Sequence, residues 1–136
     1  MYLLDTNVIS EGRRPDRGDR GALAWLDALD ADQWWVSVVT DYELELGAAG
    51  MRYRDPRQAA LLDLWLAHAR RGYAAQILPV TSEIGRICAT IQVPNRRPLT
   101  DALIAATALH HGLTLVTRNE RDFDIPGLAV INPFSG

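Results

Sequence analysis

Short apolar runs alternate with longer helical patterns along most of the chain, and this alternation restricts its fold more than any other feature. Runs with the composition of buried strands occur at 2–4, 35–39, 77–80, 113–116 and 128–131. Helices are expected at 22–29, 41–50, 57–72, 82–90 and 101–111, the last of which ends at Gly112, a typical stop signal. The alternation predicts an α/β fold in which helices cover both faces of a mostly parallel sheet of four to five strands.

The size of the chain suits one such unit. It has 136 residues, 48% of them apolar, and it contains no internal repeat or linker that would separate domains, so we expect a single domain over residues 1–136. No run approaches the roughly 20 apolar residues of a membrane span, and the first apolar run is too short for a signal peptide. One cysteine, Cys88, leaves no internal disulfide and fits a cytoplasmic location.

All 14 basic residues are arginines, although the net charge is −3. The negative charge argues against a generally basic coat for nucleic acid, and the lack of lysine excludes Schiff-base and P-loop chemistry. Arginines gather in two places, at Arg13, Arg14, Arg17 and Arg20 and again at Arg96 and Arg97. Arginine suits bidentate phosphate contacts, but a solvated arginine-rich surface is an equally good interpretation.

Four acidic residues fall where predicted strands end or predicted helices begin. Asp5 follows the first strand and Glu43 lies in the first turn of the helix after the second. Asp101 begins the last helix, and Asp122 comes a few residues after the strand at 113–116. In an open parallel sheet the strand carboxyl ends and the helix amino ends share one edge, where ligands bind. We therefore expect these four acids to converge.

Each acid also has a purely local explanation. Asp5 and Asp122 could each begin a turn. Glu43 could form a capping box with Thr40, and Asp101 could complement a helix dipole. Four coincidental carboxylates at one edge are harder to explain, because like charges held close together repel unless something neutralises them.

A divalent metal ion that prefers oxygen ligands would neutralise such a cluster. Mg²⁺ or Mn²⁺ fits a set of carboxylates, whereas zinc would favour His or Cys, and the chain has neither a CxxC nor an HExxH motif. Metal ions held by carboxylates can activate water and stabilise the departing oxygen when a phosphodiester is cleaved. The sequence also lacks the GxSxG motif of a nucleophilic serine.

Three segments, YLLDTNVIS, SVVTDYELELG and TDALIAATALHHGLTLVTRNERDF, together resemble the PIN-domain family, in particular the VapC-type toxins of bacterial toxin–antitoxin pairs. The resemblance implies a three-layer α/β/α fold, Mg²⁺- or Mn²⁺-dependent endoribonuclease activity on RNA, and a cognate antitoxin partner. It implies that the catalytic and metal-binding acids are Asp5, Glu43, Asp101 and Asp122. The polar positions that would orient these carboxylates are Thr6, Asn7, Thr117 and Asn119.

Several points stay open at the level of sequence. Glu45 lies two residues after Glu43, where similar sequences often have a basic or neutral residue. The segment RDFD offers both Asp122 and Asp124, and the family pattern of Asp before Phe selects Asp122. The aromatic segment QWW at 33–35 favours a homodimer. The rival interpretation of the whole chain is a catalytically silent, metal-binding interaction module that only binds a partner protein.

Overall fold

The computed structural model describes residues 1–135, which form one five-stranded parallel sheet with the order β3-β2-β1-β4-β5. The strands are β1 (Tyr2–Leu4), β2 (Trp34–Ser37), β3 (Ile77–Leu78), β4 (Thr114–Val116) and β5 (Val130–Ile131). The predicted α/β fold with a parallel sheet is confirmed. Because β1 lies at the centre, with β2 and β4 on either side, the ends of these three strands are neighbours.

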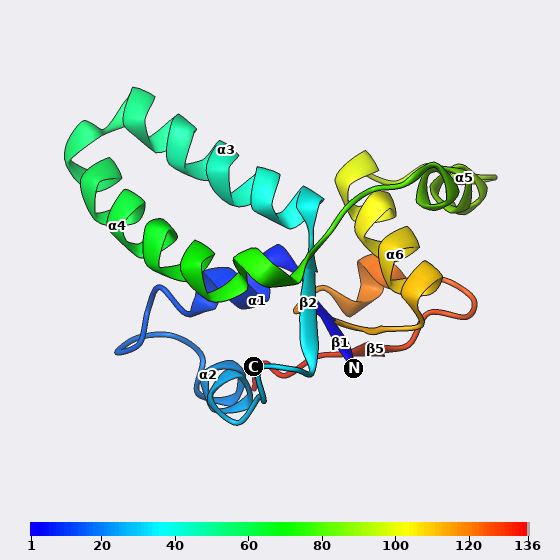
Figure 1. The fold of residues 1–136 in the computed structure, drawn as a ribbon, viewed down its shortest axis with the longest axis horizontal. Helices are drawn as coiled ribbons and strands as arrows, with labels where there is room; N and C mark the ends of the chain where they lie inside the picture. The colour runs from blue at the N-terminus through cyan, green and yellow to red at the C-terminus, as the bar shows by residue number, and fades with distance from the viewer. Residues whose placement is uncertain (136) are drawn as a thin grey trace.

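Helices cover both faces of the sheet (Figure 1). They are α1 (Thr6–Glu11), α2 (Arg20–Asp27), α3 (Val38–Arg54), α4 (Pro56–Tyr73), α5 (Ser82–Ile91) and α6 (Leu99–His111), with short 3₁₀ helices η1 (Ala74–Gln76) and η2 (Glu120–Phe123). Helices α3 and α4 form a long antiparallel hairpin that extends beyond the sheet, and α5 and α6 pack together on the other side (Figure 1). None of the helices within residues 1–135 has the length and apolarity needed to cross a membrane.

Each face of the sheet has its own hydrophobic core, because neighbouring side chains of a strand point to opposite faces. Leu3 of β1 packs in a core with Ile104 of α6. Leu4, the next residue, belongs to a second core with Val8 of α1 and Leu66 of α4. Alternate burial along the strands therefore produces the three-layer arrangement.

Helix α1 is the main element that the sequence does not predict. A loop is expected after Asp5, but residues 6–11 form a helix, and the side chain of Asp5 caps it by accepting a hydrogen bond from the backbone N–H of Thr6. Six residues contain less than two helical turns, too few for an apolar period to be recognised. The turn expected at Asp5 is thus a helix start.

The beginning of α3 also differs from the prediction. Val38 and Val39 are expected in a strand at 35–39 because β-branched residues favour strands, but α3 begins at Val38. The hydroxyl of Ser37 accepts a hydrogen bond from the N–H of Val39 at 3.0 Å and caps the helix. Glu43 therefore lies in the second turn of α3 and not in the expected first turn. Because Ser37 is the N-cap, the capping box with Thr40 that could have explained Glu43 locally does not form.

The two tryptophans of β2 do not form an exposed aromatic surface. Trp35 packs against the core on the α6 side and Trp34 against the core on the α4 side, and both are partly buried. The homodimer predicted from this segment therefore loses its structural basis and stays only a prediction.

Candidate active site

Asp5 lies at the junction of β1 and α1, at the carboxyl edge of the central strand, and is only 5% exposed. Three groups donate hydrogen bonds to its carboxylate. The backbone N–H of Thr6 donates to Oδ1 at 2.8 Å. Thr117 Oγ1 and Asn7 Nδ2 donate to Oδ2 at 2.7 and 3.3 Å. The Asp5 carboxylate is thus held in one orientation by residues from two neighbouring strand ends.

Glu43 reaches the same region from α3. The hydroxyl of Thr6 donates a hydrogen bond to Glu43 Oε1 at 2.6 Å and lies 3.3 Å from the hydroxyl of the buried Thr40. Thr6 therefore connects two predicted site acids, through its backbone N–H to Asp5 and through its side chain to Glu43.

Asp101 lies in the first turn of α6 and is partly buried. The helix begins at Leu99 with Pro98 at the N-cap, two residues before the start expected from the sequence. Burial raises the pKa of Asp101 above its ordinary value of 3.8, and the charges of Asp5 and Asp122 raise this pKa further.

The pKa of Asp5 is raised as well, mainly by its burial and to a smaller extent by the charge of Glu43. The hydrogen bonds from Thr117, Thr6 and Asn7 act in the opposite direction and lower this pKa, because they favour the ionised carboxylate. The charge of Glu43 thus acts on the pKa of Asp5, and the charges of Asp5 and Asp122 act on the pKa of Asp101.

Three of the four predicted acids line one cavity of about 400 Å³, hereafter the acidic cavity. Its walls are formed by Asp5, Thr6, Asn7, Ser10, Glu11, Arg13, Arg14, Glu43, Asp101, Arg118 and Asn119. Asp122 is not among them. It lies in η2, is exposed, and lines an adjoining depression that shares Arg118 and Asn119 with the acidic cavity.

The polar residues predicted to orient the carboxylates form one hydrogen-bonded group. Thr117 Oγ1 donates to Asp5 and accepts from Asn7 Nδ2 at 3.3 Å and from the backbone N–H of Asn119 at 3.1 Å. Asn119 thus reaches Asp5 only indirectly, through its backbone and Thr117. Arg118, which sequence reasoning missed, lines the acidic cavity and donates its backbone N–H to Asn7 Oδ1. Its position between Thr117 and Asn119 was the available signal.

The neighbouring acids that the sequence left open lie elsewhere. Glu45 points to the α3–α4 hairpin, where Arg52 Nη2 is 2.7 Å from one carboxylate oxygen and Arg70 Nη2 is 3.1 Å from the other. Glu45 is therefore part of the bracing between the two helices. Asp124 is exposed after the end of η2 and lines neither the acidic cavity nor the adjoining depression.

The ligand set has the chemistry of a site for a hard divalent ion. Carboxylates dominate it, and His and Cys are absent from the walls of the acidic cavity, which favours Mg²⁺ or Mn²⁺ over zinc. Within residues 1–135, no three His, Cys, Asp or Glu side chains lie together in a position to hold one metal ion.

Comparison with known proteins identifies the family. The family profile of the PIN domain matches residues 2–127. The chain belongs to the PIN-domain family. This PIN domain is 35% identical to toxin FitB of Neisseria gonorrhoeae over 139 residues, with 98% of this chain and 99% of FitB covered. It is 32% identical to VapC ribonuclease Y4jK of Sinorhizobium fredii, with 98% of each chain covered.

Solved structures agree with this assignment. The crystal structure of FitAcB from N. gonorrhoeae matches this PIN domain with a TM-score of 0.86 at 35% identity, over 98% of both chains. A toxin–antitoxin complex from Klebsiella pneumoniae matches with a TM-score of 0.67 at 29% identity, over 98% of both chains. The PIN domain is thus a member of the VapC/FitB toxin family.

Proposed function

We propose that this PIN domain is a divalent-metal-dependent endoribonuclease and the toxin of a toxin–antitoxin pair. The observation that carries the proposal is the meeting of Asp5, Glu43 and Asp101 in one cavity, with Asp122 near enough to raise the pKa of Asp101. Full-length similarity to a VapC ribonuclease supports the same activity.

In the proposed site, Asp5 and Asp101 would hold the metal ion directly, and Glu43 and Asp122 would complete the site. Mg²⁺ commonly uses only one or two carboxylates and fills its other positions with water and phosphate oxygens, so it does not require all four acids as direct ligands. A bound ion lowers the pKa of water and stabilises charge on the departing oxygen of the phosphodiester.

The polar residues of the site orient the carboxylates by hydrogen bonding. The hydrogen bonds from Thr117, Thr6 and Asn7 favour the ionised form of Asp5 and offset part of the effect of its burial on the pKa. Thr6 orients Glu43 at the same time. Fixing the carboxylates in this way reduces the reorganisation needed when ion and substrate bind.

A cognate antitoxin is the proposed protein partner, and the cytoplasm is the proposed site of action. This part of the proposal relies on relatives, since the matching structure from K. pneumoniae is a toxin–antitoxin complex. An antitoxin that neutralises this PIN domain would cover the acidic cavity, where neighbouring carboxylates raise the pKa of Asp5 and of Asp101.

Cleavage of RNA in the presence of Mg²⁺ or Mn²⁺ is the expected result for protein purified free of antitoxin. A panel of linear RNAs and one circular RNA should be incubated with each ion or with chelator, since only an endonuclease opens a circle. Expression should arrest growth, and co-expression of the antitoxin should relieve the arrest. Cleavage that persists in chelator would contradict the metal mechanism. No cleavage and no growth arrest would instead favour the silent interaction module.

A further inference from the structure

A second cavity of about 530 Å³ lies between the loop after α1 and the α3–α4 hairpin, and we call it the arginine cavity. Its walls are formed by Arg13, Arg14, Arg17, Met51, Gln58, Leu61, Leu62 and Trp65. Arg13 and Arg14 also line the acidic cavity, so the two cavities share a wall. The two cavities are therefore adjacent.

The three arginines of this cavity carry uncompensated charge. Arg13, Arg14 and Arg17 are exposed, and within residues 1–135 none of them forms an ion pair with a carboxylate. Arg52 and Arg70 of the hairpin, in contrast, are each paired with Glu45 and a second acid. The arginine cavity thus presents positive charge that is available to an anionic ligand.

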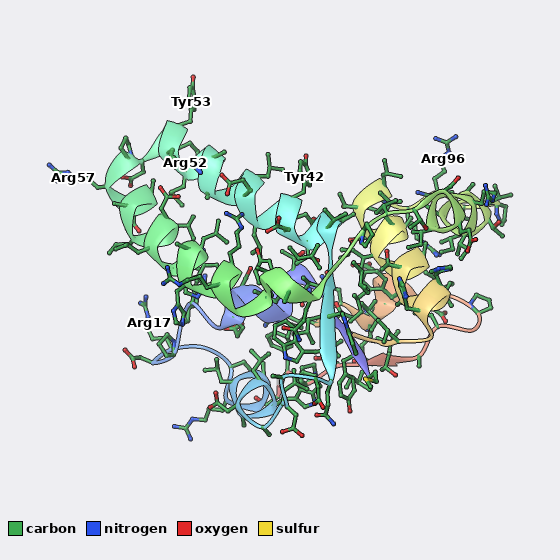
Figure 2. The ribbon with its side chains drawn as sticks, in the orientation of Figure 1. Arg17, Tyr42, Arg52, Tyr53, Arg57 and Arg96 are labelled. Atoms are coloured by element: carbon green, nitrogen blue, oxygen red, sulfur yellow. The ribbon has the colours of Figure 1, made fainter. Side chains whose placement is uncertain are left out.

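The loop that carries these arginines is held in place. The backbone carbonyl of Arg14 accepts hydrogen bonds from the N–H groups of Arg17 and Gly18 at 3.2 and 2.6 Å, and Glu11 Oε1 accepts one from the N–H of Asp19. A Cβ at position 18 would lie 2.7 Å from the Arg14 carbonyl oxygen, so this turn requires glycine. The compact turn presents Arg17 toward the hairpin (Figure 2).

The opposite wall of the arginine cavity is apolar. Leu61 of α4 is 67% exposed. Trp65 is only partly buried and, together with Leu62, is backed by the core beneath α4. A fixed aromatic ring beside free arginines can stack on a nucleobase while the arginines contact the adjoining phosphates.

We infer that the arginine cavity binds an unpaired nucleotide of a single-stranded RNA segment, next to the phosphodiester that lies in the acidic cavity. The inference rests on the proposed nuclease function and adds to it a subsite for the neighbouring nucleotide. Arg13 and Arg14 contact the phosphates that pass from one cavity to the other, Arg17 contacts the next phosphate, and Trp65 stacks on the base. A base within a duplex has both faces covered by its neighbours and cannot make this contact.

Binding can be measured apart from cleavage, by fluorescence anisotropy of a labelled eight-nucleotide single-stranded RNA in chelator at several salt concentrations. Arg17→Gln should weaken binding and reduce the salt dependence of log K by about 0.7, the value for one phosphate contact on a single strand. Arg57→Gln is the matched control, because Arg57 is exposed on α4 but points away from the arginine cavity (Figure 2). Equal effects of the two variants would overturn the inference.

The base contact is tested first by changing the RNA ligand and then by replacing Trp65. An abasic strand of the same length should bind wild type about 5- to 150-fold more weakly if one base is stacked, and a duplex should also bind more weakly. Trp65→Leu should remove the difference between normal and abasic strands, with melting temperature as the folding check. Equal affinity of wild type for both strands would overturn the inference, as would loss of antitoxin binding by Arg17→Gln with RNA affinity unchanged. Protein that binds as expected but cleaves nothing would contradict only the proposed nuclease function.

Discussion

Replacing Asp101 by asparagine is expected to abolish RNA cleavage while leaving the metal-free protein as stable as wild type or more stable. Burial, the charge of Asp5 and the charge of Asp122 all raise the pKa of Asp101, so each of them opposes its ionised form in the folded protein. Asparagine removes that unfavourable charge, and with it one of the two proposed direct metal ligands. We expect cleavage to fall at least about 100-fold, beyond the range typical of indirect partners of a metal ion.

The same substitution has a predicted pH dependence. The pKa of Asp101 is higher in the folded protein than its ordinary value of 3.8, so the folded state binds the proton more tightly than the unfolded state. The tighter proton binding stabilises folded wild type at low pH, and this stabilisation is lost as the pH rises through the raised pKa. The stability advantage of Asp101→Asn over wild type should be greatest at neutral pH and shrink as the pH falls toward 3.8. Thermal melts of both proteins across this range measure it.

If Asp101 only stabilises the end of its helix, the opposite results are expected for Asp101→Asn. An acid in the first turn of a helix stabilises it by about 0.3–1 kcal/mol through the helix dipole. Asp101→Asn would then melt at a lower temperature at neutral pH and keep its cleavage activity. Those two results together would show that Asp101 has only a structural role.

Two pairs of neighbouring acids provide matched controls for the assignment of the site. Asp122→Asn should abolish cleavage and Asp124→Asn should retain most of it, because the charge of Asp122 reaches Asp101 whereas Asp124 lines neither depression. Initial cleavage rates under identical metal and RNA concentrations compare the two variants. The reverse ranking would show that the last acidic segment is assigned out of register.

The second pair lies on α3. Glu43→Gln should abolish cleavage, because Glu43 lines the acidic cavity and is bound by Thr6. Glu45→Gln should leave cleavage nearly unchanged and cost at most about 1 kcal/mol of stability, since its ion pairs with Arg52 and Arg70 are substantially exposed. Loss of activity in Glu45→Gln with full activity in Glu43→Gln would contradict the orientation of α3.

Apart from α1, the order of the strands and α-helices and the convergence of Asp5, Glu43 and Asp101 follow from the sequence, because apolar periodicity reports strand and helix positions and parallel topology brings their ends to one edge. The ends of the elements were harder to anticipate. The two valines that open α3 favour a strand by composition, but they lie in a helix that the Ser37 hydroxyl caps.

The arginine cavity could not be predicted from the sequence in this way. It forms only because the loop carrying Arg17 is folded against a hairpin whose residues are more than 30 positions away, and no local pattern encodes that apposition. The sequence could also not show that Asp122 borders the acidic cavity instead of lining it, since a 3₁₀ helix sets its position. The sequence also could not show that Trp34 and Trp35 pack against the two cores.

Thermal melts of wild type and Asp101→Asn over a titration of Mn²⁺ test whether these carboxylates together hold a divalent ion. An ion that binds only the folded state raises the unfolding free energy by RT ln(1 + [L]/Kd). The melting temperature should therefore rise with Mn²⁺ in wild type and stay nearly constant in Asp101→Asn. An equal rise in both proteins, or no rise in wild type at millimolar Mn²⁺, would show that Asp101 and its neighbours do not form a metal site.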